Sequence, residues 1–143
     1  MKKTTLILFV ICILVGCKDK LISPNNNQKI NISTDKNTYN VNENIIVSIK
    51  NESQSASYFS HCNYRIGFYI EKKQNSNWTE IGNIAIVCLA IYPSGTTILG
   101  PFQSYTDTID ESQTGTYRLK FPYSPQNNGE FAESLYSNEF VVQ

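Results

Sequence analysis

Alternation of apolar and polar positions dominates this chain from residue 30 onward. Ile45, Val47 and Ile49, for example, fall on one face of an extended segment. A period of two with many β-branched and aromatic residues is typical of half-buried strands, and clusters of Asn, Asp and Ser between such segments favour turns. We therefore expect strands at residues 30–33, 45–50, 64–72, 77–81, 96–99, 104–110, 115–121 and 138–142.

These segments predict an all-β fold, an antiparallel β-sandwich of about seven to nine strands. Residues 77–81 should return as the hairpin partner of residues 64–72. Residues 83–92 are ambiguous, because their apolar run fits a buried strand and a buried helical turn equally well. Gly115 precedes Tyr117 by two positions at a strand start, which matches the tyrosine corner of Ig-like sandwiches; an ordinary buried strand tyrosine is the alternative.

The N-terminus has a different pattern. Lys2 and Lys3 precede an apolar run that stops at Gly16 and Cys17. A basic head, a short apolar segment and a small-residue cleavage site describe a secretory signal peptide, and the run is too short for the roughly 20 residues of a membrane-spanning helix. We expect a signal peptide at residues 1–16, a polar, flexible tether at 17–28 and one domain at 29–143.

The stretch Leu14-Val15-Gly16-Cys17 resembles the lipobox of bacterial lipoproteins. This resemblance implies a diacylglyceryl group on the Cys17 sulfur and contact with the membrane through that lipid. Lys18 at the second mature position favours the outer membrane by analogy, on its periplasmic or surface face. An ordinary cleaved signal that happens to end near a cysteine is the alternative.

Charge and cysteine content narrow the function further. Loss of Lys2 and Lys3 lowers the basic count from 12 to 10, against 12 acidic residues, so no basic field exists to recruit nucleic acid. Cys62 and Cys88 remain in the mature domain, and two cysteines in an oxidising compartment usually pair. Two separate buried thiols and a metal site including His61 are the alternatives, although no CxxC spacing occurs.

Catalysis is hard to assemble from these residues. His61 is the only histidine, and we interpret it as a loop or cap residue rather than a general base. Asp107, Asp110 and Glu111 could hold calcium, but a solvated strand end explains them more simply. We expect no enzymatic activity, no cofactor and no metal.

A series of short motifs resembles bacterial Ig-like domains of lipoproteins over about residues 30 to 142. The series is Thr38-Tyr39, residues 45–51, Trp78, Pro93-Ser94-Gly95, Gly115-Thr116-Tyr117-Arg118 and residues 139–142. The resemblance implies a non-catalytic envelope module for protein or glycan interaction or structural support, without identifying the ligand. Here Cys62 and Cys88 lie closer in sequence than an antibody disulfide, so they would tie the central hairpin to the following loop.

The same order of motifs is similar to the BsuPI-type proteinase inhibitors, which are also β-sandwiches. This second resemblance implies a protease inhibitor as the alternative function. Its contact loop would have to protrude and be rigid, and Pro122-Tyr123-Ser124-Pro125 is the candidate. The many tyrosines of the domain fit either a contact surface or ordinary strand filling.

Overall fold

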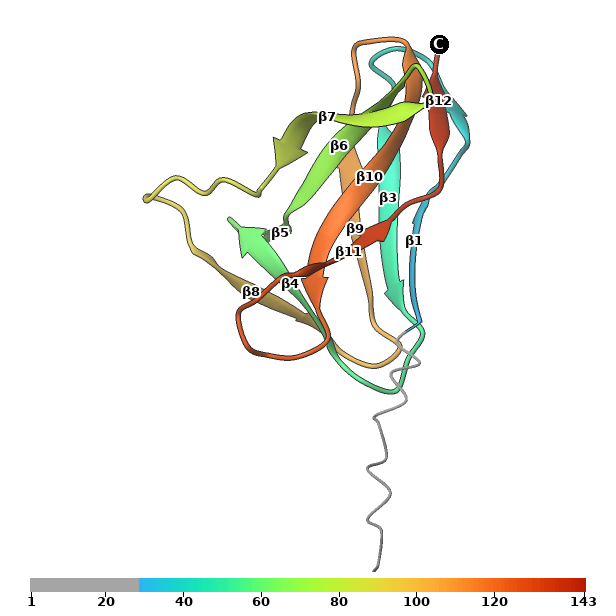
Figure 1. The fold of residues 1–143 in the computed structure, drawn as a ribbon. Coiled ribbons are helices and arrows are strands. Elements are labelled where there is room, and N and C mark those ends of the chain that lie inside the picture. The colour runs from blue at the N-terminus through green and yellow to red at the C-terminus, as the bar shows by residue number, and fades with distance from the viewer. Residues whose placement is uncertain (1–28) are drawn as a thin grey trace, which may run out of the picture.

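The computed structural model describes residues 29–143, which form two packed β-sheets (Figure 1). The predicted all-β sandwich is confirmed. The predicted signal peptide (1–16), the tether (17–28) and Cys17 lie outside the described residues. Within residues 29–143, no helix has the length and apolar character needed to cross a membrane. The strands are β1 (Ile30–Thr34), β2 (Thr38–Tyr39), β3 (Ile45–Asn51), β4 (Ser57–Cys62), β5 (Arg65–Ile66), β6 (Phe68–Gln74), β7 (Asn77–Ile84), β8 (Ser94–Leu99), β9 (Ser104–Ile109), β10 (Gly115–Ser124), β11 (Glu133–Tyr136) and β12 (Phe140–Val142).

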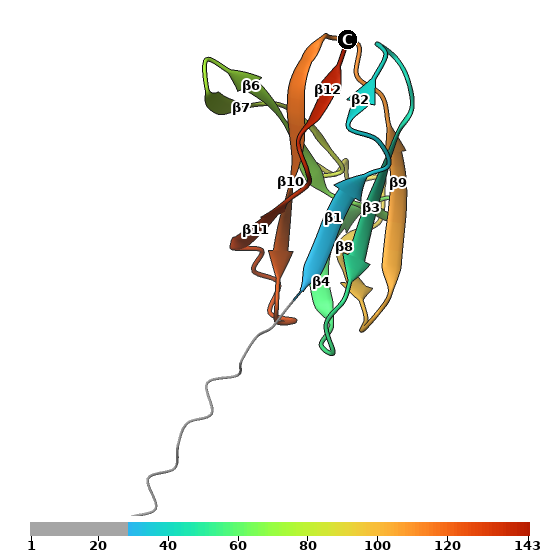
Figure 2. The same ribbon diagram turned by 90° about the vertical axis from the view of Figure 1, so that its right-hand side faces the viewer.

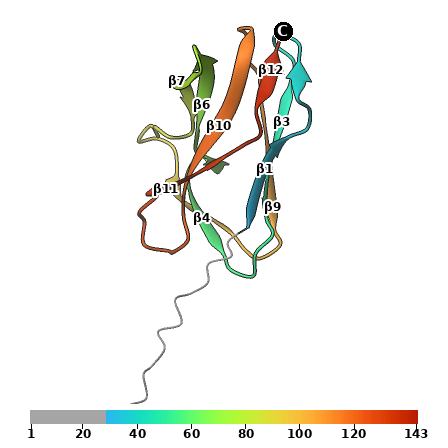
Figure 3. The same ribbon diagram turned by 45° about the vertical axis from the view of Figure 1, so that its right-hand side comes forward.

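One sheet has the order β1-β3-β9, and the second is built around β10. Figure 2 shows β1, β3 and β9 as one layer beside β10 and β12. Strand β10 pairs with β6 and β4 and also with β12 and β11, so that it lies between β6 and β12 (Figure 3). The short strand β2 pairs with β12 in parallel, whereas the other pairs are antiparallel.

The core lies between the two sheets, and the alternation in the sequence fills it as expected. Ile45, Val47 and Ile49 of β3 are buried, as are Leu119 and Phe121 of β10. The rings of Phe68 and Phe121 pack with their centroids 4.7 Å apart. Every buried side-chain nitrogen and oxygen of residues 29–143 has a hydrogen-bond partner.

The single strand predicted at residues 64–72 is wrong, because Tyr64 belongs to a turn and a break at Gly67 divides the rest into β5 and β6. Strand β4 turns at Asn63 and Tyr64, both with positive φ, and returns as β5. Gly67 then separates β5 from β6: a Cβ at this position would lie 2.8 Å from the carbonyl oxygen of Ala85, so only glycine allows this approach. Tyr64 is consequently exposed instead of facing the core with Ile66.

The predicted contact loop at residues 122–125 is also wrong. Pro122, Tyr123 and Ser124 are the last residues of β10, and Pro122 pairs with Ser134 of β11. Tyr123 is buried and its hydroxyl donates to Glu133 Oε2 at 2.7 Å. Burial together with this hydrogen bond raises the pKa of Tyr123 to about 12. Residues 122–124 are thus sheet, since they pair with β11 and Tyr123 packs in the core.

Candidate functional site

The predicted tyrosine corner is present at the start of β10. Tyr117 is fully buried, and its hydroxyl donates to the carbonyl oxygen of Gln113 at 2.6 Å. Gly115 has a φ of 154° at the bend before it, a conformation that side chains rarely adopt. The corner fixes the loop that precedes β10, and this role is structural.

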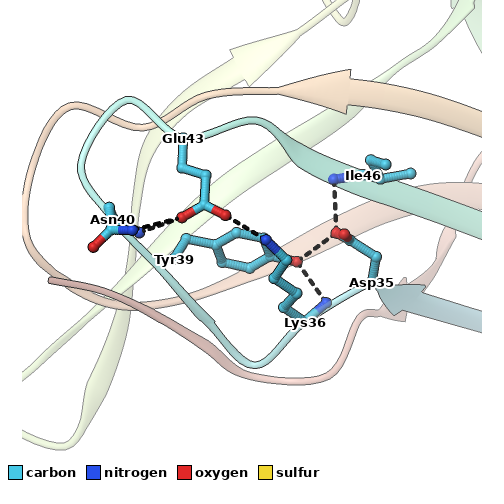
Figure 4. Close-up of polar contacts among 6 residues, drawn as sticks. All are labelled: Asp35, Lys36, Tyr39, Asn40, Glu43 and Ile46. Atoms are coloured by element: carbon cyan, nitrogen blue, oxygen red, sulfur yellow. Dashed lines mark hydrogen bonds and ion pairs between the residues drawn. The ribbon is translucent and has the colours of Figure 1, made fainter.

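A second polar network closes the turns between β1, β2 and β3 (Figure 4). The Tyr39 hydroxyl donates to Asp35 Oδ1 at 2.7 Å, and the same oxygen accepts from the Ile46 N–H at 3.0 Å. Glu43 binds the Lys36 ammonium and the backbone N–H of Asn40. Desolvation alone would raise the pKa of Asp35, but the hydrogen bonds from Tyr39 and Ile46 lower it overall. These groups satisfy one another, so the network is a structural clamp.

The residues considered for catalysis or metal binding do not come together. His61 lies in β4, where the structure corrects the expected loop or cap position, and its Nδ1 is 3.0 Å from Thr97 Oγ1. Asp107 is held by Arg65, whose Nε and Nη2 donate to its two carboxylate oxygens at 3.0 Å each. Among residues 29–143, no group of three His, Cys, Asp or Glu side chains could hold a metal ion.

Cys62 and Cys88 form a disulfide with Cα atoms 5.3 Å apart, as the cysteine count predicted. The bond joins the end of β4 to the segment between β7 and β8, which is the hairpin-to-loop connection expected from the sequence. Residues 83 and 84 complete β7, and residues 85–93 form neither a strand nor a helix. A hydrogen bond of 2.8 Å from Asn63 N–H to the Pro93 carbonyl ties the other end of this loop to the β4–β5 turn.

This tethered loop belongs to a surface of exposed apolar side chains, at whose edge the ring of His61 stacks on Tyr64 with the centroids 6.0 Å apart. We define the uncharged flank as six large apolar side chains whose exposed fractions run from 55% to 80%: Tyr64, Val87, Leu89, Ile91, Ile98 and Phe102. Five of them lie within residues 81–106, which contain no Asp, Glu, Lys, Arg or His. Exposed apolar patches of this kind mark interaction sites.

The outer face of the second sheet has the opposite character. The Arg118 guanidinium lies between the rings of Trp78 and Tyr136, at 4.4 Å and 4.2 Å from their centroids. The Arg118 Nε donates to the buried carboxylate of Glu71 at 2.6 Å. The Lys73 ammonium also lies over the Trp78 ring, 5.3 Å from its centroid. Cations therefore cover these aromatic faces, and we refer to Trp78, Arg118 and Tyr136 as the ladder.

A groove of about 350 Å³ opens on this face next to the ladder. Its walls come from β4, β6, β10, β11 and the loops before β8 and β11, with the lining residues Ser60, Tyr69, Ile86, Lys120, Pro122, Phe131 and Ser134. The Lys120 ammonium lies 5.3 Å from the Tyr69 ring centroid, and no ion pair within residues 29–143 involves it. The groove thus combines apolar and aromatic side chains, hydroxyl groups and one positive charge without an ion-pair partner in the described residues.

The comparisons with known proteins agree with this architecture. A family model described as a bacterial Ig-like domain matches residues 26–134. The chain belongs to the bacterial Ig-like domain family. Ig-like domains of this kind are typically non-enzymatic interaction modules. No curated protein matches the sequence.

Several solved structures are similar to this Ig-like domain in fold. PapD-like domain 7 of human CEP192 is 11% identical with a TM-score of 0.40, and the match covers 100% of this chain and 95% of that one. A CARDB domain from Pyrococcus furiosus is 18% identical with a TM-score of 0.38, covering 79% and 93%. The alkylpurine DNA glycosylase AlkC of Pseudomonas fluorescens is 11% identical with a TM-score of 0.45, and the match covers 80% of this chain but only 30% of the glycosylase. Likenesses at this level say nothing of function.

Neither the flank nor the groove was predicted from the sequence. The flank had a readable signal, since residues 81–106 form the longest stretch of the chain without a charged residue or histidine. The groove had none, because it depends on register: Lys120 faces Tyr69 on β6 and Tyr136 on β11. Pairings of this kind join residues far apart in sequence.

Proposed function

We propose that this Ig-like domain is a non-catalytic recognition module of the bacterial cell envelope, attached to the membrane by lipid on Cys17. In this proposal it binds an acidic ligand, a peptide or a glycan with a carboxylate, in the groove around Lys120. The observation that carries the proposal is the ammonium of Lys120, which has no ion-pair partner among residues 29–143, inside a groove lined by hydroxyl groups and aromatic rings.

The chemistry of the groove supports a carboxylate-bearing ligand. Lys120 lies beside the Tyr69 ring in this groove, where its ammonium can attract a ligand carboxylate at short range. The hydroxyl groups of Ser60 and Ser134 can donate to or accept from a polar ligand. Tyr69 and Phe131 add flat apolar area.

The sequence supports attachment at the envelope. The basic head, the apolar run and the lipobox-like Leu14 to Cys17 order are those of a lipoprotein precursor. More than one acyl chain on Cys17 would give stable anchoring, since each buried methylene contributes about 0.8 kcal/mol. The attachment is tested by replacing Cys17 with Ser: the altered protein should leave the membrane fraction, and the mass of its N-terminal peptide should lack acyl groups. A protein that stays in the membrane fraction with unchanged mass contradicts lipid attachment.

Ligand binding is tested with the mature chain carrying Cys17→Ser, on arrays of acidic and neutral oligosaccharides and of peptides with a free C-terminal carboxylate. We expect retention of acidic ligands and at least a tenfold loss with Lys120→Ala or Phe131→Ala. Lys50→Ala is the matched control, because it removes the same charge from the other sheet. Equal binding by Lys120→Ala and Lys50→Ala would refute the groove as the site.

Protease inhibition is the alternative function. The loop expected to contact a protease is not a protruding loop, because residues 122–124 belong to β10. The mature chain can be assayed against serine, cysteine and metalloproteases at stoichiometric amounts. Our proposal predicts no inhibition, and tight inhibition of any of these proteases would replace it.

A further inference from the structure

One end of the uncharged flank lies close to the start of the domain. The Lys29 carbonyl accepts from Glu52 N–H at 2.8 Å, and Asn51 N–H donates to the Gln103 carbonyl at 2.9 Å. The turn that carries Phe102 therefore lies at the end of the sandwich where the described chain begins. From this turn, β8 leads to the loop of residues 85–93, which projects from the side of the sandwich in Figure 1.

We propose that the uncharged flank is a membrane-contact surface that rests on the neutral interface of a lipid bilayer, with the side chains of the 85–93 loop inserted between the lipids. The inference rests on the proposed function in one respect, that the domain is held at an envelope membrane. It assigns to the domain itself a lipid contact in addition to the lipid on Cys17.

The length of chain before the domain favours this occupant. Only residues 18–28 separate Cys17 from Lys29, and a chain of that length spans at most about 40 Å when fully extended. Lipid on Cys17 would hold the Phe102 end of the flank within that distance of the bilayer. A second, weak membrane contact is then made at high effective concentration, so little intrinsic affinity is needed.

The chemistry of the flank also favours lipid. Entry of a charged side chain into the interface is costly, and residues 81–106 contain none. Val87, Leu89 and Ile91 supply aliphatic side chains at alternate positions of the projecting loop. Tyr64 is exposed and has an amphipathic ring of the kind that prefers the headgroup region. Its turn is held to the end of the loop by the hydrogen bond from Asn63 N–H to the Pro93 carbonyl. The Tyr92 N–H donates to the Leu89 carbonyl at 2.9 Å, which satisfies part of the loop backbone.

A protein partner fits this surface less well. Protein interfaces combine an apolar centre with a polar rim and about one hydrogen bond per 100–200 Å². Here the apolar side chains occupy a projecting loop, two turns and strand β8, and residues 81–106 supply no charge for a rim. A fluid lipid interface adapts to such a convex surface without shape complementarity.

The test uses the mature chain with Cys17→Ser, so that acyl chains on residue 17 do not contribute, and vesicles of neutral phosphatidylcholine. The loop variant is Val87→Ser/Leu89→Ser/Ile91→Ser. The control is Val41→Ser/Ile46→Ser/Val141→Ser, which removes three exposed aliphatic side chains outside the flank. We expect the loop variant to lower the partition coefficient at least about 100-fold, and the control to change it less than about threefold. Added salt should leave the partition unchanged, because no charge takes part.

Three results would overturn the inference. The first is no partition of the starting chain into neutral vesicles, and the second is equal partition of the loop variant and the control. The third is an envelope protein whose binding the loop variant abolishes while vesicle partition is absent, which makes the flank a protein interface. Lipid attachment is decided separately by the mass of the N-terminal peptide. Vesicle binding through the loop by a protein that proves unacylated in cells would sustain this inference and refute the anchor.

Discussion

Removal of the Cys62–Cys88 bond should cost this domain a large fraction of its stability. The two cysteines are 26 positions apart. Closing a loop of that size in the unfolded chain removes about 3.5 kcal/mol of conformational entropy at 25 °C in the chain-entropy model. Since domains of this size are stable by about 5–15 kcal/mol, the variant Cys62→Ala/Cys88→Ala should remain folded but be clearly weakened.

Equilibrium urea unfolding followed by the fluorescence of Trp78, the single tryptophan, measures this loss. The midpoint should fall by roughly 2 M for a slope near 2 kcal/mol/M, and the slope should rise because the denatured chain expands without the crosslink. Reduction should destabilise the starting protein by a similar amount and leave the alanine variant unchanged, which is the control. A loss below about 1 kcal/mol would refute the entropic reasoning.

Three further changes test individual parts of the fold. Tyr117→Phe should lose about 1 kcal/mol in urea unfolding through its missing backbone hydrogen bond, whereas Tyr136→Phe, whose side chain is exposed, should lose nearly nothing; equal losses would contradict the tyrosine corner. Asn51→Ala should lower the free energy of unfolding by about 3 kcal/mol in the same assay, because the buried amide donates to three carbonyl oxygens and accepts from the Ser53 hydroxyl. A loss under about 1 kcal/mol would show that water takes over these hydrogen bonds. The carboxyl of Asp35 has a pKa lowered below its ordinary value of 3.8, so its stabilising effect is present above that pH and is lost as the pH falls through the folded-state pKa. In urea unfolding from pH 6 to 2.5, the stability difference between the starting protein and Asp35→Asn should therefore shrink as the pH falls below about 3.8. A difference that stays constant with pH would contradict this.

Apolar periodicity predicted the sandwich because the same side chains that alternate in the sequence fill the core. Ile45, Val47 and Ile49 are buried on β3 as their spacing required. The Tyr117 corner and the Cys62–Cys88 bond were also readable, since each depends on a short-range rule or on a count of candidates. Neither feature requires knowledge of which strands pair.

Where the prediction failed, long-range contacts had outweighed the local pattern. Residues 64–72 alternate as one strand would, yet Gly67 approaches the Ala85 carbonyl and divides them. Pro122 and Pro125 suggested a rigid loop, but pairing with β11 draws residues 122–124 into β10. Ala85 and β11 both lie outside the short window in which period and turn composition are read, so neither pattern contains these contacts.

Charge pattern and apolar pattern inform on different surfaces of this domain. The apolar pattern is satisfied once the core is filled, and it therefore gives no information on which outer face is used. The charge pattern continues to discriminate, because an exposed side with no ionisable group loses little hydration free energy when it is covered, whereas a side with lysines and carboxylates loses much. In a chain with 17% charged residues, residues 81–106 have none, and they lie largely exposed. The side that is cheapest to remove from water is thus encoded in the linear sequence, while the groove around Lys120 is encoded only in the register of the sheet.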